Sequence, residues 1–258
     1  MSDRAVLVGI DEYQGKPLGG AVNDALRMRA ELMAVAPAVE TALLLDKTAT
    51  RQAILDQLAW LVSGATAGDR RFFFFSGHGM QLGTIDPAVE RDGRDEAICP
   101  VDIHLQSGEN AIRDKELRRI FAAIPSGVSF AWVSDSCCSA NLTRGLGSTR
   151  ITKALPSPRG TGRGAIVSGL ARSAQGLQVA MISACASNGT AEEGDFEQGR
   201  SGALTQVLLE VLRQGDGLRV PLSEVVSRAA GRLAQRGYPQ VPEIEGDPAL
   251  AALPLWTF

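Results

Sequence analysis

Apolar runs and amphipathic segments alternate along most of this chain. Four compact apolar runs have the length and composition of buried strands: residues 5–10, 41–46, 127–134 and 178–184. Other segments repeat apolar residues at helical spacing: residues 24–33, 54–61, 114–124, 202–214 and 222–236. This alternation predicts an α/β fold with a predominantly parallel central sheet and helices on both faces.

The most informative apolar run is the row of four phenylalanines from Phe72 to Phe75. Such a row fits neither one face of a helix nor an alternating strand, so it predicts a short strand buried on both faces of a parallel sheet. Ser76-Gly77-His78-Gly79 follows directly, at the carboxyl edge where open α/β sheets bind ligands. The two glycines let the backbone bend sharply and approach a substrate, which places His78 for chemistry.

A cysteine follows another predicted strand. Residues 127–134 lead into Asp135-Ser136-Cys137, so a thiol also emerges at a carboxyl edge. A cysteine needs a nearby imidazole or an electropositive setting to act as a nucleophile at neutral pH, and His78 supplies one. Backbone N–H groups at Gly79 and Cys137 are then the candidate donors to a developing oxyanion.

Each of these residues also has a purely structural interpretation. His78 can be held by local hydrogen bonds alone, and Cys137 can be an inert buried thiol. Cys138 competes with Cys137 as the nucleophile because the two are adjacent. The remaining histidine is expected at the surface and the remaining cysteines in the core: His104, Cys99 and Cys185.

Composition narrows the class of protein. The chain has 258 residues, 45% of them hydrophobic, which is ample for a core. The net charge of −3 with interspersed signs argues against nucleic-acid and membrane partners. No signal peptide or membrane-length apolar run is present, and the four cysteines lack zinc-like spacing. We therefore expect a cytoplasmic monomer with reduced thiols.

The motifs together resemble the caspase-like superfamily, most closely its metacaspase and bacterial orthocaspase branch. His78 and Cys137 stand 59 positions apart (137 minus 78), and the cysteine follows Asp-Ser as in metacaspases. Further segments occur in the order that such proteases show: residues 6–10, 20–24, 92–102 and 200–205. The resemblance implies a caspase-like three-layer sandwich and a cysteine endopeptidase with a His78–Cys137 dyad that forms a thioester acyl-enzyme.

The resemblance also implies a pocket for the residue before the cut, at Ala21, Asp24, Ser76 and Asp135. Two carboxylates there favour a cationic side chain, whereas a pocket for aspartate would need arginines. The sequence therefore predicts protein or peptide substrates that are cleaved after Arg or Lys.

Residues 141–178 differ in composition from the rest of the chain. They include seven glycines and six basic residues but no Asp or Glu, which predicts a mobile surface loop. In a protease that cuts after basic residues, this loop is a candidate for self-cleavage or for cleavage by an activating protease, or else a linker that is never cut. The candidate processing sites are Arg144, Arg150, Lys153, Arg159, Arg163 and Arg172.

We accordingly interpret residues 1–258 as a single catalytic domain in three parts. Residues 1–145 form the larger part with the dyad, residues 146–178 the flexible basic linker, and residues 179–258 the smaller part. By analogy with the family, the expected role is regulated proteolysis in stress, defence or cell-death-like signalling.

Calcium is where the sequence departs from its relatives. Many metacaspases are activated by calcium through acidic residues, but here Lys115 follows Asp114 and the later acidic position matches Arg144. Cations at these positions repel Ca²⁺, so we expect an enzyme without a metal or other cofactor. A different acidic cluster leaves a calcium site open: Asp86, Glu90, Asp92 and Asp95.

Two other functions compete with proteolysis. One is an interaction or regulatory module with a caspase fold whose chemistry is dispensable. The other is a redox protein that uses the adjacent thiols of Cys137 and Cys138.

Overall fold

The structure is a computed structural model that describes residues 2–85, 93–137, 149–158, 174, 176–185 and 190–255. Its centre is a six-stranded sheet in the order β12-β9-β7-β3-β1-β2. Its strands are β1 (Arg4–Gly9), β2 (Glu40–Leu45), β3 (Arg70–Ser76), β7 (Ser129–Asp135), β9 (Ala180–Ser183) and β12 (Glu243–Gly246). All neighbours are parallel except β12, which pairs antiparallel with β9 at one edge. The predicted α/β fold with a mostly parallel sheet is confirmed.

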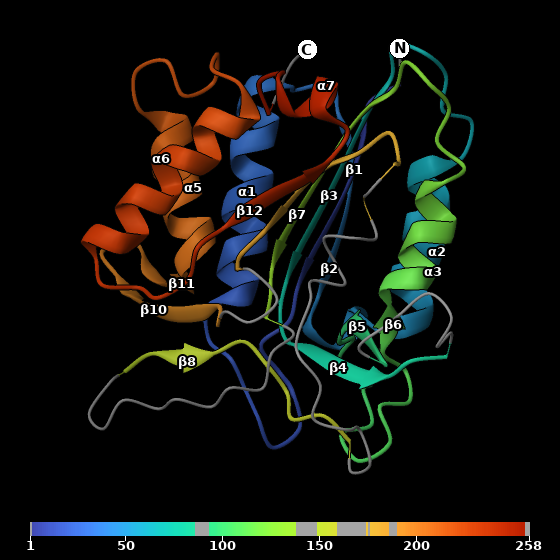
Figure 1. Cartoon of the computed structure of the whole chain (residues 1–258), viewed down its shortest axis with the longest axis vertical. Coiled ribbons are helices and arrows are strands. Elements are labelled where there is room, and N and C mark those ends of the chain that lie inside the picture. The colour runs from blue at the N-terminus through green and yellow to red at the C-terminus, as the bar shows by residue number, and fades with distance from the viewer. Residues whose placement is uncertain are drawn as a thin grey trace.

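Helices cover both faces of this sheet (Figure 1). On one side are α1 (Ala21–Val35), α5 (Ala203–Arg213), α6 (Leu222–Gln235) and the short α7 (Pro248–Ala251). On the other side are α2 (Arg51–Val62) and α3 (Asp114–Phe121), with a 3-10 turn, η1 (Asp46–Thr48), before α2. The two cores meet at the sheet, which gives the expected three layers.

The phenylalanine run serves both cores. Phe73 and Phe75 pack into the core under α2 and α3, whereas Phe72 and Phe74 pack into the core under α1, α5 and α6. All four side chains are at most 4% exposed. Successive residues of a strand point to opposite faces, so a strand between two helical layers has no polar face.

Two small antiparallel sheets lie beyond the ends of the central strands, at the lower end of Figure 1. One contains β4 (Gly79–Gly83), β5 (Arg94–Ile98) and β6 (Ile112–Arg113). The other contains β8 (Ile151–Thr152), β10 (Glu192–Phe196) and β11 (Gly199–Gly202). Both add residues to the edge where β3 and β7 end.

These small sheets include the main differences from the predicted elements. The apolar pattern indicates no strand between residues 184 and 202, but β10 and β11 form a hairpin there. Glu193 is fully buried in it because its carboxylate accepts hydrogen bonds from Gly19, Gly20 and Arg200. Residues 79–83, which follow the phenylalanine run and carry no strand pattern, form β4.

The basic segment also differs from its expected form where it is described. Residues 149–158 do not extend into solvent, because β8 pairs with β10 and Leu155 bonds to Gly79 of β4. Lys153 and Leu155 are fully buried. This part of the linker therefore lies against the end of the central sheet.

Candidate active site

His78 and Cys137 lie at neighbouring strand ends. β3 and β7 are parallel neighbours in which Ser76 is paired with Asp135. His78 follows the first of these residues by two positions and Cys137 follows the second by two. Both side chains are buried, at 2% and 0% exposure. The topology therefore brings together the two residues that the sequence pairs.

A loop after β1 holds the imidazole. Nε2 of His78 lies 2.8 Å from the carbonyl oxygen of Lys16, so Nε2 carries the proton and donates it. The His78 backbone N–H donates to the Tyr13 hydroxyl at 3.1 Å, and the two rings are 4.7 Å apart. Tyr13 in turn donates to the carbonyl of Cys99 at 2.7 Å.

This arrangement leaves Nδ1 of His78 as the basic nitrogen. Within the described residues, Nδ1 is buried and makes no hydrogen bond. Burial lowers the pKa of His78 to about 4, although the nearby carbonyls of Lys16 and Lys153 oppose the shift. The imidazole is therefore neutral at pH 7 and can accept a proton.

Two backbone N–H groups converge on one carbonyl oxygen. The N–H groups of Gly79 and Cys137 each donate to the Lys153 carbonyl at 3.1 Å. The next peptide is fixed as well, because Leu155 donates to the Gly79 carbonyl at 2.8 Å. The pair of donors predicted for an oxyanion thus holds a peptide carbonyl of the chain itself.

The Lys153 side chain enters an acidic pocket at the same edge. Its Nζ lies 2.7 Å from Ser76 Oγ, 3.2 Å from Asp135 Oδ1 and 3.4 Å from Asp24 Oδ2. All four residues are fully buried. Three of the four residues predicted for the pocket therefore surround one cation.

The fourth residue predicted for the pocket lies nearby in another role. Ala21 is the first residue of α1, and its N–H donates to Asp11 Oδ1 at 2.8 Å. A side chain on Gly9 would collide with the Ala21 carbonyl. Ala21 thus fixes the start of α1 against β1, and α1 brings Asp24 to the pocket.

Charge in the pocket is balanced by opposing effects. Burial raises the pKa of Asp24 to about 6, with Asp135 adding to the rise and Lys153 opposing it. Burial alone would lower the pKa of Lys153, but attraction to Asp135, Asp24 and Glu193 outweighs it and raises the pKa. Lys153 therefore keeps its positive charge although it is fully buried.

Residues of β11 and α5 complete the pocket. Thr205 donates to Asp135 Oδ2 from its backbone at 2.9 Å and from its hydroxyl at 2.6 Å. Ser201 and the Gly202 N–H donate to Asp24. A side chain on Gly202 would collide with the Asp135 carboxylate and the Lys153 amine. In the sequence, residues 200–205 are recognisable only as a motif. In the structure, their hydrogen bonds hold the two carboxylates of the pocket.

The other candidate residues are distributed as follows. Of the processing candidates, Arg150 and Lys153 are described, whereas four lie outside the described residues: Arg144, Arg159, Arg163 and Arg172. Cys138 also lies outside them. His104 is exposed, Cys99 is buried and Cys185 is partly buried.

Asp95 is the member of the acidic cluster near β5 that the structure describes, and two cations pair with its carboxylate. The other acids of that cluster, Asp86, Glu90 and Asp92, lie outside the described residues. Asp95 is fully buried and accepts from Lys115, from Arg113 at 2.7 Å and from Thr84 at 2.6 Å. The described residues contain no group of three or more His, Cys, Asp or Glu side chains that could hold a metal ion.

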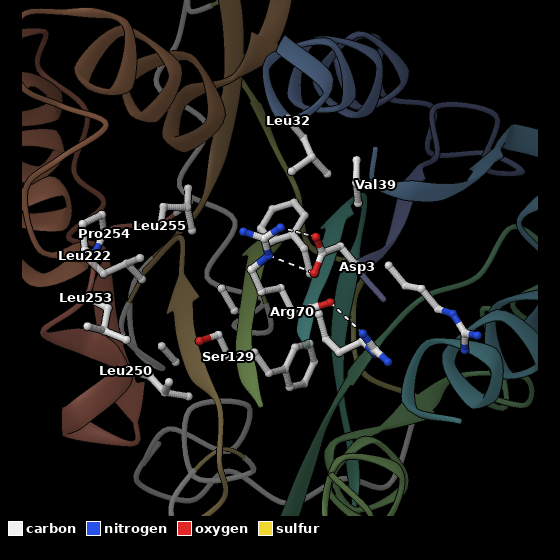
Figure 2. A pocket seen from close by; sticks show the side chains of 16 residues that line it. Asp3, Leu32, Val39, Arg70, Ser129, Leu222, Leu250, Leu253, Pro254 and Leu255 are labelled. Carbon is white, nitrogen blue, oxygen red and sulfur yellow. Dashed lines mark hydrogen bonds and ion pairs between the residues drawn. The ribbon is translucent and has the colours of Figure 1, made fainter. Parts of the chain in front are cut away.

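A pocket at the opposite edge of the sheet holds none of the predicted site residues. It lies at the amino ends of β3 and β7, where Arg70 binds Asp3 and leucines such as Leu222, Leu250 and Leu253 line one side (Figure 2). Among the described helices, none is long and apolar enough to cross a membrane.

Comparisons with known proteins agree with this geometry. A family model described as "Metacaspase, peptidase C14 domain" matches residues 3–144. Metacaspase-2 of Trypanosoma brucei brucei is 29% identical over 96% of this chain and 74% of its own length. Metacaspase-5 of Trypanosoma cruzi is 30% identical over 93% of this chain and 56% of its own length. Metacaspase-3 of Arabidopsis thaliana is 35% identical over 54% of this chain and 40% of its own length.

A solved structure supports the fold. The crystal structure of a protein from Geobacter sulfurreducens matches with a TM-score of 0.74, covering 100% of this chain and 99% of that one. Its sequence is 22% identical, so the match concerns the fold alone.

Proposed function

Because the chain belongs to the metacaspase family of cysteine peptidases, it is a hydrolase of protein substrates, and we propose that it cuts them after Lys or Arg with His78 and Cys137. The observation that carries this proposal is the position of Lys153 in the acidic pocket. Its amine contacts Ser76, Asp24 and Asp135, and its carbonyl accepts both backbone donors. A substrate residue before the cut needs both of these contacts.

The proposed mechanism follows from the site geometry. Nδ1 of His78 takes the proton of the Cys137 thiol, and the thiolate attacks the substrate carbonyl carbon to form a C–S bond. The N–H groups of Gly79 and Cys137 stabilise the oxyanion. His78 then protonates the leaving amine as the C–N bond breaks, and water hydrolyses the thioester. The Lys16 carbonyl keeps the ring in the required tautomer.

The acidic pocket supports a preference for cationic residues. An aspartate side chain there would face two buried carboxylates and repel them, whereas Lys or Arg forms charge-assisted hydrogen bonds with them. Ser76 adds an uncharged acceptor, 2.7 Å from the Lys153 amine. The same contacts would disfavour neutral side chains, because these leave the carboxylates without a partner.

The same position of Lys153 supports activation by cleavage of the linker. In the uncut chain, Lys153 fills the pocket and its carbonyl engages both oxyanion donors, so external substrates are excluded. Cleavage of the Lys153–Ala154 bond would release this block. The cut falls within the linker at residues 146–178 and separates a larger part with β1, β3 and β7 from a smaller part with β9 and β12. Both parts remain joined through one sheet.

Calcium does not fit the member of the acidic cluster that the structure describes, Asp95. Asp95 already binds the Lys115 amine, which supplies the positive charge that a calcium ion would bring. Ca²⁺ needs several oxygen ligands and would meet two cations there, Lys115 and Arg113. The proposed reaction therefore uses protein groups and water alone.

We assign the proposed reaction to regulated proteolysis of the stress, defence or cell-death-like kind by analogy with the family.

The first test is the fate of the chain itself. We expect purified wild type to yield a fragment ending at Lys153 and another beginning at Ala154, detected by intact mass and terminal sequencing. Cys137→Ala should stay uncut, Lys153→Arg should be cut at the same bond, and Lys153→Ala should not be cut there. Arg219→Ala, which removes an exposed basic residue outside the linker, provides the control.

A second test uses fluorogenic peptides that end in Arg, Lys or Asp, assayed in EDTA. We expect hydrolysis after Arg and Lys only, abolished in Cys137→Ala. Hydrolysis after Asp would contradict the pocket assignment, and a Cys137→Ala enzyme with full activity would contradict the nucleophile. If no peptide is cut and the chain remains whole, the caspase-fold interaction module is the better description.

A further inference from the structure

The side chain of Arg150 lies in a cage of its own, away from the acidic pocket. Its guanidinium is 3.9 Å from the centre of the Tyr238 ring. It donates to the Gly237 carbonyl at 2.7 Å and to the Arg236 carbonyl at 3.0 Å. The Glu192 carboxylate lies 3.7 Å away. An aromatic face, two carbonyls and an acid thus meet one cation.

The cage belongs to the body of the enzyme, and only its occupant belongs to the linker. Glu192 lies in β10, and residues 236–238 follow α6 directly. Phe196 stacks on Tyr238 with the ring centres 6.1 Å apart. A side chain on Gly194 would collide with the Tyr238 hydroxyl, so this glycine makes room for the ring. The cage would therefore persist after the linker is cut.

The chain between Arg150 and Lys153 follows the path of a bound substrate. Residues 151–152 form β8, which pairs antiparallel with residues 192–193 of β10. Lys153 then donates its N–H to the Ala191 carbonyl at 2.9 Å. An extended peptide with its basic residue in the acidic pocket would make the same ladder, and its side chain three residues earlier would enter the cage.

The chemistry of the cage favours arginine over lysine or a neutral residue. The guanidinium is planar, so it can lie over the tyrosine ring while two of its nitrogens reach the two carbonyls. An ammonium group lacks this geometry. Arg236, the other arginine near the cage, does not compete with Arg150 for Glu192, because it binds Glu210 at 2.8 Å. Glu192 is 13% exposed and Arg150 32% exposed, so solvent weakens the attraction without removing it.

We propose that Tyr238, Glu192 and the carbonyls of Arg236 and Gly237 form a second substrate subsite, which takes an arginine three residues before the basic residue at the cut. The subsite rests on the proposed function, because the position of the cut is counted from Lys153. Preferred substrates then carry the pattern Arg-x-x-Lys or Arg-x-x-Arg. Arg150 fills this subsite in the uncut chain and helps to hold the linker in place.

The test compares two tetrapeptides with the same reporter on the processed enzyme. One is Arg-Ile-Thr-Lys, the sequence of residues 150–153, and the other is Gln-Ile-Thr-Lys. We expect kcat/KM to be about tenfold higher for the first, mainly through KM, because a partly exposed cation–π and carboxylate contact is lost in the second. A Lys-Ile-Thr-Lys peptide should fall between them.

Variants of the cage locate the effect. Tyr238→Leu and Glu192→Gln should each reduce the ratio of kcat/KM between the arginine and glutamine peptides several-fold. Glu224→Gln, which alters an exposed acid paired with Arg228, serves as the matched control. Arg150→Gln should lower KM for the arginine peptide, because the tail of the enzyme itself no longer competes for the cage.

The outcomes separate this subsite from the proposed function. Equal cleavage of both peptides after lysine would overturn the subsite and leave the peptidase and its acidic pocket intact. A preference for arginine that survives both Tyr238→Leu and Glu192→Gln would also overturn it. Cleavage of neither peptide would overturn the proposed function and the subsite with it.

Discussion

Two lysines lie against buried carboxylates in this molecule, and they differ in what holds them there. Lys115 belongs to α3 and binds Asp95, which also accepts from Arg113 and Thr84. Lys153 belongs to the basic linker and is held between Asp24 and Asp135 at 3.4 and 3.2 Å. The first lysine is part of a helix, whereas the second lies on a segment that the proposed reaction cuts.

The difference teaches how one fold can use the same ion pair for structure and for recognition. Asp95 is paired with a lysine of α3 and has two further donors, so the balance of its charge does not depend on the linker. Asp24 and Asp135 keep hydrogen bonds from Ser201 and Thr205 when Lys153 leaves, but they lose their counter-ion. An acidic pocket without its cation would then attract a basic side chain from a substrate.

The largest effect is expected from Asp135→Asn on hydrolysis of peptides with arginine before the cut. Removal of one partner from a buried charge pair costs about 2–5 kcal/mol, which is roughly 30-fold to several-thousand-fold in kcat/KM. Steady-state kinetics measures this loss, and the surface variant Asp216→Asn is the matched control. A loss below about fivefold would mean that Asp135 only supports the fold through Thr205.

The second prediction compares the two lysines directly, in a Cys137→Ala background that prevents cleavage. Lys115→Met should lower the free energy of unfolding by about 1–3 kcal/mol, because buried Asp95 loses a charged donor. Lys153→Met should cost less than about 1 kcal/mol, since the linker can lift and let water reach the carboxylates. Urea denaturation measures both. An equal or larger loss for Lys153→Met would make it a structural ion like Lys115.

The third prediction concerns pH. Burial raises the pKa of Asp24 to about 6, although the cation of Lys153 opposes this rise, so the carboxyl titrates near pH 6. It is therefore protonated as the pH falls, and the attraction for a basic substrate is lost. We expect kcat/KM to fall about tenfold from pH 7 to pH 5.

Asp24→Asn separates this titration from other groups. The variant should be less active at pH 7 and should lack the acidic limb near pH 6. Protonation of His78, whose pKa is lowered to about 4, should reduce kcat/KM only at a lower pH than protonation of Asp24 does. Circular dichroism at pH 5 checks that the fold is retained. An unchanged limb in Asp24→Asn would assign the titration to another group.

The smallest effect is expected from calcium. Because Lys115 already neutralises Asp95, millimolar CaCl₂ or EDTA should change kcat/KM by less than about twofold. Rates measured with each addition test this, with MgCl₂ as the control. A strong stimulation by calcium alone would show that other acids, such as those at residues 86–92, build a site.

Much of the frame could be predicted from the sequence, because hydrophobic patterning alone specifies which strands are buried. The phenylalanine run, the strand before Asp135 and the helices of both layers occur where their patterns place them. The hairpin of β10 and β11 was missed because its buried acid, Glu193, resembles a solvent-exposed residue until Arg200 and the N–H groups of Gly19 and Gly20 are seen to neutralise it.

The site was only partly predictable for a different reason. His78 and Cys137 could be identified from their side chains and their strand ends, but the partner of His78 is the backbone carbonyl of Lys16, which has no signature of its own in a sequence. Six basic residues in the linker looked equivalent. The pairing of β8 with β10, which no sequence pattern indicates, brings Lys153 to the acidic pocket.

The attachment of the linker has a consequence for the enzyme after it is cut. Lys153 follows Cys137 by 16 positions (153 minus 137), so after the proposed cut the new carboxyl terminus would stay tethered beside the site and act as a product inhibitor. A short tether gives an effective concentration on the order of millimolar, and Arg150 adds a second point of attachment. Substrates would have to displace this tail. The processed enzyme would therefore cleave proteins that are locally abundant, or that bind through both the acidic pocket and the arginine subsite, and would spare dilute ones.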